Sequence, residues 1–195
     1  MQLEPRILEG RFVRLEPYAP ALREEVRAAL DCDPESWNLF SVCGQGEHFD
    51  AWWNDALRTM AAGSQVAHAV RRLADGRVVG TTSFLNIRRE HCGCEIGATF
   101  YHPDARASAV NPDCKRLLLG RAFDDGALRV DIVTDARNQR SQAAIAKLGA
   151  LREGVLRRHK LTWTGHVRDT VVFAVTDLDW PQVRAGLDAR LAAWP

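Results

Sequence analysis

The sequence predicts an α/β protein of the α+β kind, in which a mixed, mostly antiparallel sheet carries helices on both faces. Strand pairs with turn signals lie before and after the middle of the chain, whereas the middle itself alternates strand, helix, strand and helix. Hairpins give antiparallel neighbours and a strand–helix–strand passage gives a parallel pair, so the sheet is expected to be mixed. The 195 residues suit one domain spanning 1–195.

Two helices are predicted before the first hairpin. A short strand covers Gly10–Pro17 and ends at a proline, and apolar residues then recur at helical spacing through Ala21–Leu30 and Phe49–Met60. Trp52 and Trp53 are adjacent and cannot share one helix face, so one of them is expected to line a groove or an interface. The alternative is that both pack in the core.

Turn residues between β-rich segments predict one hairpin on each side of the middle of the chain. The predicted strands are Val66–Arg72 and Val78–Ile87, joined around Asp75-Gly76, and Leu151–Trp163 and Val167–Thr176, joined around Gly165. An amphipathic helix, Trp180–Leu191, follows the second hairpin.

The stretch Glu95–Gly149 is expected to hold the functional centre, because two helices there begin directly after two strands. The first strand covers Glu95–Tyr101. Asn111 is expected to cap the helix that follows, with Pro112 at its first position, since these residue types favour those places. The unpaired N–H groups at such a helix start can bind phosphate.

A second strand and helix repeat this arrangement. The strand lies within Ala127–Asp135, and Asn138 is expected to cap the next helix. Ser141, in the first helical turn, projects toward the predicted buried face that carries Ala144 and Ile145. Ser141 is therefore a candidate functional group, with a local capping hydrogen bond as the alternative.

Composition argues against several classes of function. The formal net charge of +1, from 26 basic and 25 acidic residues, gives no electrostatic basis for binding nucleic acid or a membrane. The five cysteines lack framework or zinc-site spacing, so we expect reduced thiols and no metal. No signal peptide or membrane-spanning apolar stretch is apparent, and a cytoplasmic location is expected.

Four runs of the sequence resemble the GNAT family of N-acetyltransferases. They are EIGATFYHP from Glu95, RASAVNPDCKRLLLGRAF from Arg106, LRVDIVTDARNQRSQAAIAKLGA from Leu128 and REGVLRRH from Arg152. The resemblance extends from about Gly10 to Asp177 and favours the RimJ/RimL-like branch, which acetylates the N-termini of ribosomal proteins. It implies the GNAT fold, with splayed central strands, and an N-acetyltransferase that uses acetyl-CoA.

The resemblance also implies where acetyl-CoA binds. The cofactor would enter between the splayed strands, with its pyrophosphate on the loop before the first helix. Alanine and asparagine stand at two glycine positions of the family's loop pattern, namely Ala109 and Asn111. The cofactor-binding residues implied are Phe100, Tyr101, Arg106, Ala107, Ser108, Ala109, Val110, Asn111, Lys115, Asn138 and Ser141.

Glu95 is the candidate general base. Acetyl transfer needs a neutral amine, and an N-terminal α-amine with a pKa near ~8 needs only modest help from a carboxylate acting through water. Glu95 opens the first splayed strand and is expected to share a strand face with Gly97, Thr99 and Tyr101. The alternative is a surface or ion-paired glutamate.

Two further catalytic roles follow from the resemblance. A backbone N–H in the range from Ala98 to Tyr101 would polarise the thioester carbonyl, and Ser141 would protonate the leaving thiolate. The expected acceptor is the N-terminal α-amine of a protein, of the ribosomal-protein-alanine type. Alternatives are a small amine, such as a polyamine or antibiotic, or a catalytically weak CoA-binding module, which the two replaced glycines favour. Trp52, Trp53 and the last helix could supply a homodimer interface.

Overall fold

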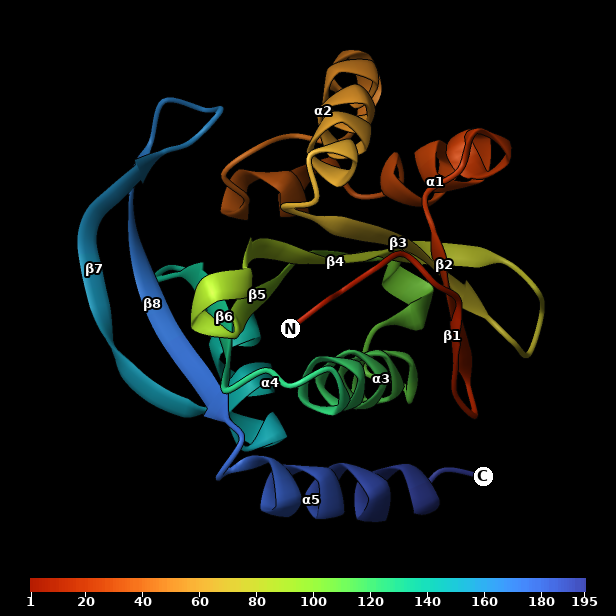
Figure 1. The fold of residues 1–195 in the computed structure, drawn as a ribbon. Helices are drawn as coiled ribbons and strands as arrows, with labels where there is room; N and C mark the ends of the chain where they lie inside the picture. Colours follow the sequence, from red (N-terminus) through yellow and green to blue (C-terminus); the bar gives the residue numbers. More distant parts are fainter.

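The structure, a computed structural model, describes residues 1–195 and contains one eight-stranded sheet with helices on both faces (Figure 1). The strands are β1 (Leu8–Glu9), β2 (Val13–Pro17), β3 (Val66–Arg72), β4 (Val78–Arg88), β5 (Gly93–Tyr101), β6 (Arg129–Asp135), β7 (Leu151–Leu161) and β8 (Val167–Thr176). The helices are α1 (Arg23–Leu30), α2 (Phe49–Ala61), α3 (Val110–Asp124), α4 (Gln139–Leu148) and α5 (Trp180–Ala192). None of these helices is long and apolar enough to span a bilayer.

The predicted fold class is confirmed. The strand order is β1-β2-β3-β4-β5-β6-β8-β7, and every neighbouring pair is antiparallel except β5–β6, which α3 connects. Both predicted hairpins form, as β3–β4 and β7–β8. β7 lies at the edge of the sheet, is exposed along nearly its whole length, and shifts register twice against β8, after Arg152 and after Leu156.

The two central strands splay apart, as expected. β5 and β6 pair over only three positions, from Gly93–Arg129 to Glu95–Asp131, although both strands continue beyond this point. Ion pairs fasten the closed end, because Asp131 accepts from Arg88 Nη2 at 2.7 Å and from Arg129 Nε at 2.6 Å. Past Glu95, the two strands diverge and leave a gap within the sheet.

A β-bulge in β5 changes which side chains share a face. Ser83 of β4 pairs with Gly97 while Thr81 pairs with Phe100, so β5 has one extra residue here. Ala98 absorbs it with a left-handed backbone, φ +46°. The prediction that Glu95 shares a face with Thr99 and Tyr101 is therefore wrong, and alanine gave no sequence signal for a conformation that usually selects glycine.

Two hydrophobic cores cover the two faces of the sheet. One lies between the sheet and α3, α4 and α5, and includes Ile96; the other lies under α1 and α2, and includes Phe100 (Figure 1). The opposite placement of Ile96 and Phe100 reflects the bulge. Trp53 is buried in the second core, stacked on Tyr18, whereas Trp52 is only partly buried and faces the gap.

Helix α3 begins at Val110, so the predicted cap at Asn111 is wrong. Ala109 is the N-cap residue and makes no side-chain capping bond. Ser108 Oγ instead accepts a hydrogen bond from the Val110 N–H at 3.2 Å. Pro112 falls inside the first turn, where a missing N–H costs nothing because that position has no intrahelical partner.

Asp113 ties α3 to the N-terminal part of the sheet. Its carboxylate is 3% exposed and accepts hydrogen bonds from the backbone N–H groups of Phe12, at 2.7 Å, and Val13, at 3.1 Å. Burial raises the pKa of Asp113 although these two bonds oppose the rise. A Cβ on Gly10 would come within 2.5 Å of the same carboxylate, so glycine leaves room for it.

Replacing Asp113 with alanine is expected to lower the free energy of unfolding by about 2–3 kcal/mol, because two N–H groups lose their partner in a buried place. Asp124→Ala is the matched control, since Asp124 is an exposed residue of the same helix. Urea unfolding followed by circular dichroism would measure both. Equal effects of the two substitutions would contradict the role given to Asp113.

Candidate functional site

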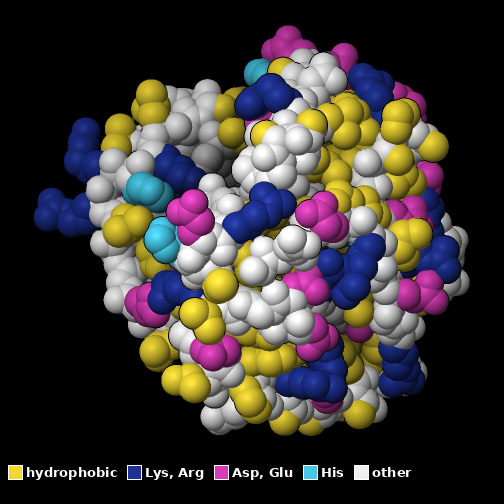
Figure 2. Space-filling model, in the orientation of Figure 1, with side chains coloured by type: hydrophobic (Ala, Val, Ile, Leu, Met, Phe, Trp, Pro, Cys, Tyr) yellow, Lys and Arg dark blue, Asp and Glu magenta, His cyan; other side chains and the backbone are white.

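A cleft of about 720 Å³ lies where β5 and β6 part. The surface is visibly hollowed there, beside the lobe formed by β7 and β8 (Figure 2). Nine of the predicted site residues line it: Glu95, Phe100, Tyr101, Arg106, Ala107, Asn111, Lys115, Asn138 and Ser141. The side chains of Ser108, Ala109 and Val110 do not. The cleft walls come from α2, α3, α4, β5, β6 and β8, so the site draws on both halves of the chain.

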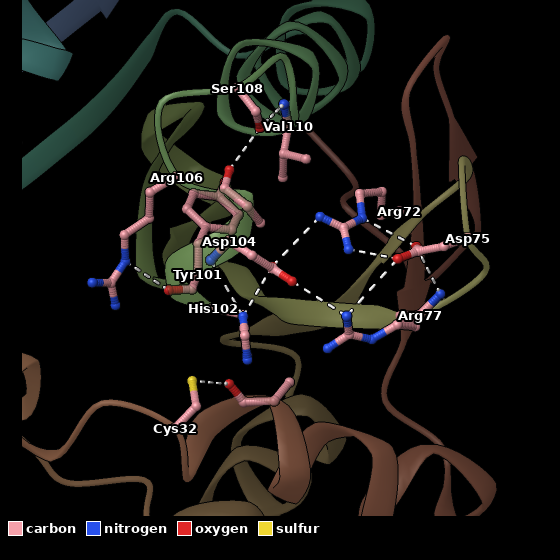
Figure 3. A network of polar contacts seen from close by, with 12 residues as sticks. Cys32, Arg72, Asp75, Arg77, Tyr101, His102, Asp104, Arg106, Ser108 and Val110 are labelled. Carbon is pink, nitrogen blue, oxygen red and sulfur yellow. Dashed lines mark hydrogen bonds and ion pairs between the residues drawn. The ribbon is translucent and has the colours of Figure 1, made fainter.

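Local hydrogen bonds hold the loop between β5 and α3 (Figure 3). Arg106 Nε donates to the backbone oxygen of Tyr101 at 2.9 Å, and Ser108 Oγ donates to the backbone oxygen of Ala105 at 2.7 Å. Arg106 also forms an ion pair with Asp33 at 2.6 Å. Its guanidinium thus fixes the loop to the segment after α1, and part of its charge is already neutralised.

The backbone of this loop explains why it needs no glycine at the two replaced positions. The residue with a left-handed backbone is Ala107, at φ +53°, whereas Ala109 has φ −68° and Asn111 lies inside α3. Ala109 and Val110 turn their side chains into the core, at 6% and 3% exposure. In the first turn of α3 the Val110 N–H donates to Ser108 and Pro112 has no N–H, so the Asn111 N–H is the one that has no acceptor in the protein.

Helix α4 presents the second group of predicted residues. Asn138 caps it as predicted, because its Oδ1 accepts a hydrogen bond from the Ser141 N–H at 3.0 Å. The Ser141 side chain lies on the cleft wall. Ile145 is buried as predicted, but Ala144 is exposed and lines the cleft, because the parted strands leave no cover over it.

Three carboxylates line the cleft, and they differ in their partners. Asp135 is 1% exposed; burial would raise its pKa, but hydrogen bonds from Arg137 outweigh burial and lower it. Asp55, on α2, is paired with Arg58. Glu95 accepts only from the neutral amide of Asn86, at 2.8 Å. Glu95 is thus the cleft carboxylate that has no cationic partner.

Gly97 leaves room for the Glu95 carboxylate. A Cβ at this position would lie 3.1 Å from Glu95 Oε1 and 2.8 Å from Leu85 Cδ1. Any larger residue would crowd the carboxylate against its own strand. The glycine therefore lets Glu95 lie along β5 toward the bulge at Ala98, where the strands part.

Lys115 is a buried cation on the cleft wall. It is 7% exposed, and its Nζ donates to Thr99 Oγ1 at 3.0 Å without any carboxylate within ion-pair distance. Burial lowers the pKa of Lys115 to about 8. A buried ammonium that has only a neutral hydroxyl as partner costs stability, and it offers a ready counter-charge to an anionic ligand.

Sequence reasoning missed Arg168, a second buried cation that lines the cleft. It is 6% exposed, and its Nη1 donates to Ser41 Oγ at 2.8 Å. Its only signal in the sequence was an arginine near the start of a mostly apolar strand. No group of three or more His, Cys, Asp or Glu side chains is placed to hold a metal ion.

Comparison with known families gives one match. The model of the acetyltransferase (GNAT) domain matches residues 13–151, which is more than half of the chain. Comparison with curated proteins finds no match.

Solved structures share this fold over almost the whole chain. A GCN5-related N-acetyltransferase from Brucella melitensis is 26% identical, with a TM-score of 0.91 over 99% of this chain and 88% of its own. A proposed acetyltransferase from T. thermophilus is 36% identical, with a TM-score of 0.85 over 98% and 100%. RimJ from Mycobacterium smegmatis, in complex with CoA-disulfide, shares the fold at 18% identity, with a TM-score of 0.82 over 95% of each chain.

Replacing Lys115 with methionine is expected to stabilise the protein by about 2–3 kcal/mol at pH 7, because the buried charge is removed and the volume kept. The pKa of a lysine is near ~10.4 in the unfolded chain and about 8 in the folded one. Between these two pKa values Lys115 is protonated in the unfolded chain and largely neutral in the folded protein. The stability of the wild type therefore rises with pH, and the stability advantage of the methionine variant shrinks.

Urea unfolding at pH 7 and pH 10 would measure this difference. Lys147→Met, at an exposed position of α4, is the control and should change little at either pH. A stability loss in Lys115→Met at pH 7 would contradict the expectation.

Proposed function

The chain belongs to the GNAT acetyltransferase family and is an acetyl-CoA-dependent N-acetyltransferase; from this premise we propose that its acceptor is the N-terminal α-amine of a protein. The observation that carries the proposal is the mixed charge of the cleft. Glu95 lines the cleft and would serve an amine there, while Lys160 and Arg168 also line it. A polycationic acceptor would be repelled by these cations, whereas a peptide N-terminus carries only one charge.

The cleft suits acetyl-CoA, which would supply the acetyl group as a thioester. The loop from Arg106 to Ala109, together with the Asn111 N–H in the first turn of α3, would bind its pyrophosphate. Lys115, which has no ionic partner in the protein, would give a counter-charge one helical turn further along. Asn138 and Ser141 border the cleft from α4, where they would contact the pantetheine arm. The CoA-disulfide bound to RimJ supports this placement by analogy of fold.

In the proposed mechanism, Glu95 accepts a proton from the acceptor amine through a water molecule. The neutral nitrogen attacks the thioester carbonyl, whose oxygen is stabilised by a backbone N–H near Ala98. That N–H belongs to the part of β5 that has no β6 partner. The C–N bond forms, the C–S bond breaks, and the Ser141 hydroxyl gives a proton to the departing sulfur; the proton that the new amide nitrogen loses passes through water and restores the hydroxyl.

The two alternatives stand on weaker ground. A site for a small polyamine would be expected to be acidic, whereas this cleft combines three carboxylates with several cations. The CoA-binding module was suggested by the missing glycines, but the loop places ordinary backbone angles at Ala109 and Asn111. The cytoplasmic location, the single domain and the homodimer stay predictions. Trp53 is buried and contributes nothing to an interface.

A thiol-release assay would test the function. Purified protein would receive acetyl-CoA together with peptides beginning with Ala, Ser or Met, or with spermidine-like polyamines. We expect free thiol with the peptides and little with the polyamines. Tight binding of acetyl-CoA with no thiol release across the panel would support the binding module instead.

Glu95→Gln is expected to lower kcat at pH 7 by about 100-fold, the usual contribution of a general base. The loss should shrink toward pH 9, because an α-amine with a pKa near ~8 becomes neutral without help. Asp55→Asn, which removes another cleft carboxylate, should stay near wild type. Steady-state rates from pH 6 to 9 would measure this, and an unchanged pH profile in Glu95→Gln removes Glu95 as the base.

A further inference from the structure

Arg168 lies on β8 with its side chain toward the α1–α2 face of the sheet. Val171 and Phe173 of the same strand face the opposite core, and Arg168 reaches Ser41, which precedes α2. Glu95 faces the same side from β5, because Ile96 beside it points into the other core. Arg168 and Glu95 both line the cleft, so a cation and a carboxylate meet the acceptor from two different strands.

The guanidinium of Arg168 is not satisfied by the protein. Its Nη1 donates to Ser41, but its Nε has no partner, and no carboxylate lies within ion-pair distance. Burial lowers the pKa of Arg168, while the charges of Asp135 and Glu95 oppose the change. Asp135 is already occupied by three hydrogen bonds from Arg137.

A second unpaired group lies beside it. Thr170 is two residues further along β8 on the same face, is 0% exposed, and its Oγ1 has no hydrogen-bond partner. Buried polar atoms are nearly always paired in folded proteins, so the unpaired Nε of Arg168, a residue that lines the cleft, calls for an explanation, whereas Thr170 does not line the cleft. An acceptor group that brings an oxygen to this wall of the cleft would supply one.

We propose that Arg168 binds the carbonyl oxygen next to the reacting amine, so that the enzyme selects α-amino carbonyl compounds over simple alkyl amines. This inference rests on the proposed acetyl transfer to an N-terminal amine. The forked N–H groups of arginine match a planar oxygen acceptor, and burial strengthens such a bond. In a peptide N-terminus the amine and this carbonyl sit on one carbon atom, so Glu95 and Arg168 would read the two groups together.

The test compares alaninamide with isopropylamine, in which a methyl group replaces the carboxamide that carries this carbonyl. Wild type is expected to prefer alaninamide in kcat/KM. Arg168→Met should reduce that preference by about 10- to 100-fold, because a site built for a polar group discriminates through it. Arg168→Lys should fall between, since it keeps the charge and loses the fork. The difference in amine basicity cancels when each variant is compared with wild type.

Arg140→Met is the matched control, because Arg140 is an exposed cleft-lining arginine on α4. It should keep the wild-type preference. The Kd for acetyl-CoA of Arg168→Met is measured alongside and should match wild type, and its unfolding midpoint should be no lower than that of wild type. An equal loss for both acceptors in Arg168→Met, or a retained preference, would overturn the proposal.

Two further measurements complete the test. One distinguishes a peptide from a free amino acid as the source of the carbonyl, and the other distinguishes failure of the proposed function from failure of the role given to Arg168. A peptide beginning with Ala should be preferred over free alanine; the reverse order would keep the role of Arg168 but overturn the protein acceptor. If wild type acetylates no amine, the proposed function fails. Calorimetric binding of alaninamide and isopropylamine in the presence of CoA then still tests Arg168, which is supported only if Arg168→Met weakens alaninamide alone.

Discussion

The position at which β5 and β6 stop pairing determines where the sheet opens and which groups line the cleft. Three residue pairs join the strands, ion pairs around Asp131 fasten that end, and the bulge at Ala98 turns β5 away. Because the strands part after Glu95, the sheet exposes backbone groups in its own middle instead of at an edge. The start of α3, the start of α4 and the carboxylate of Glu95 all become accessible from that single gap.

Much of the fold could be predicted from local chemistry. Residue types placed Asn138 at the start of α4, Gly149 at its end and Asp75-Gly76 in the turn between β3 and β4. The bulge could not be predicted, because its left-handed residue is an alanine and the flip of faces depends on the partner strand. The start of α3 was misplaced for a related reason: Ser108 caps from outside the helix, and Pro112 tolerates more than one place in the first turn.

The site residues that belong to a sequence motif could be predicted. Those whose special property is burial in the folded protein could not. Glu95 and Ser141 stand in recognisable runs, whereas nothing in the sequence distinguishes Arg168 from a surface arginine. Its character comes from burial without an ionic partner, which depends on how β8 meets the loop that carries Ser41. Lys115 and Arg168 both retain charge in the interior at a cost to the folded state, and both lie on the walls of the cleft. These unpaired charges destabilise the folded protein at places where a bound ligand of opposite charge can compensate them.

The irregular edge of the sheet has a consequence for association. β7 is long, exposed and carries apolar side chains such as Leu151 and Leu161, which would make a straight edge a template for another chain. Its two register shifts, and the left-handed backbone of Arg158 at φ +49°, break the row of N–H and C=O groups that an incoming strand would need. The irregular pairing of β7 with β8 therefore protects this edge of the sheet from edge-to-edge aggregation.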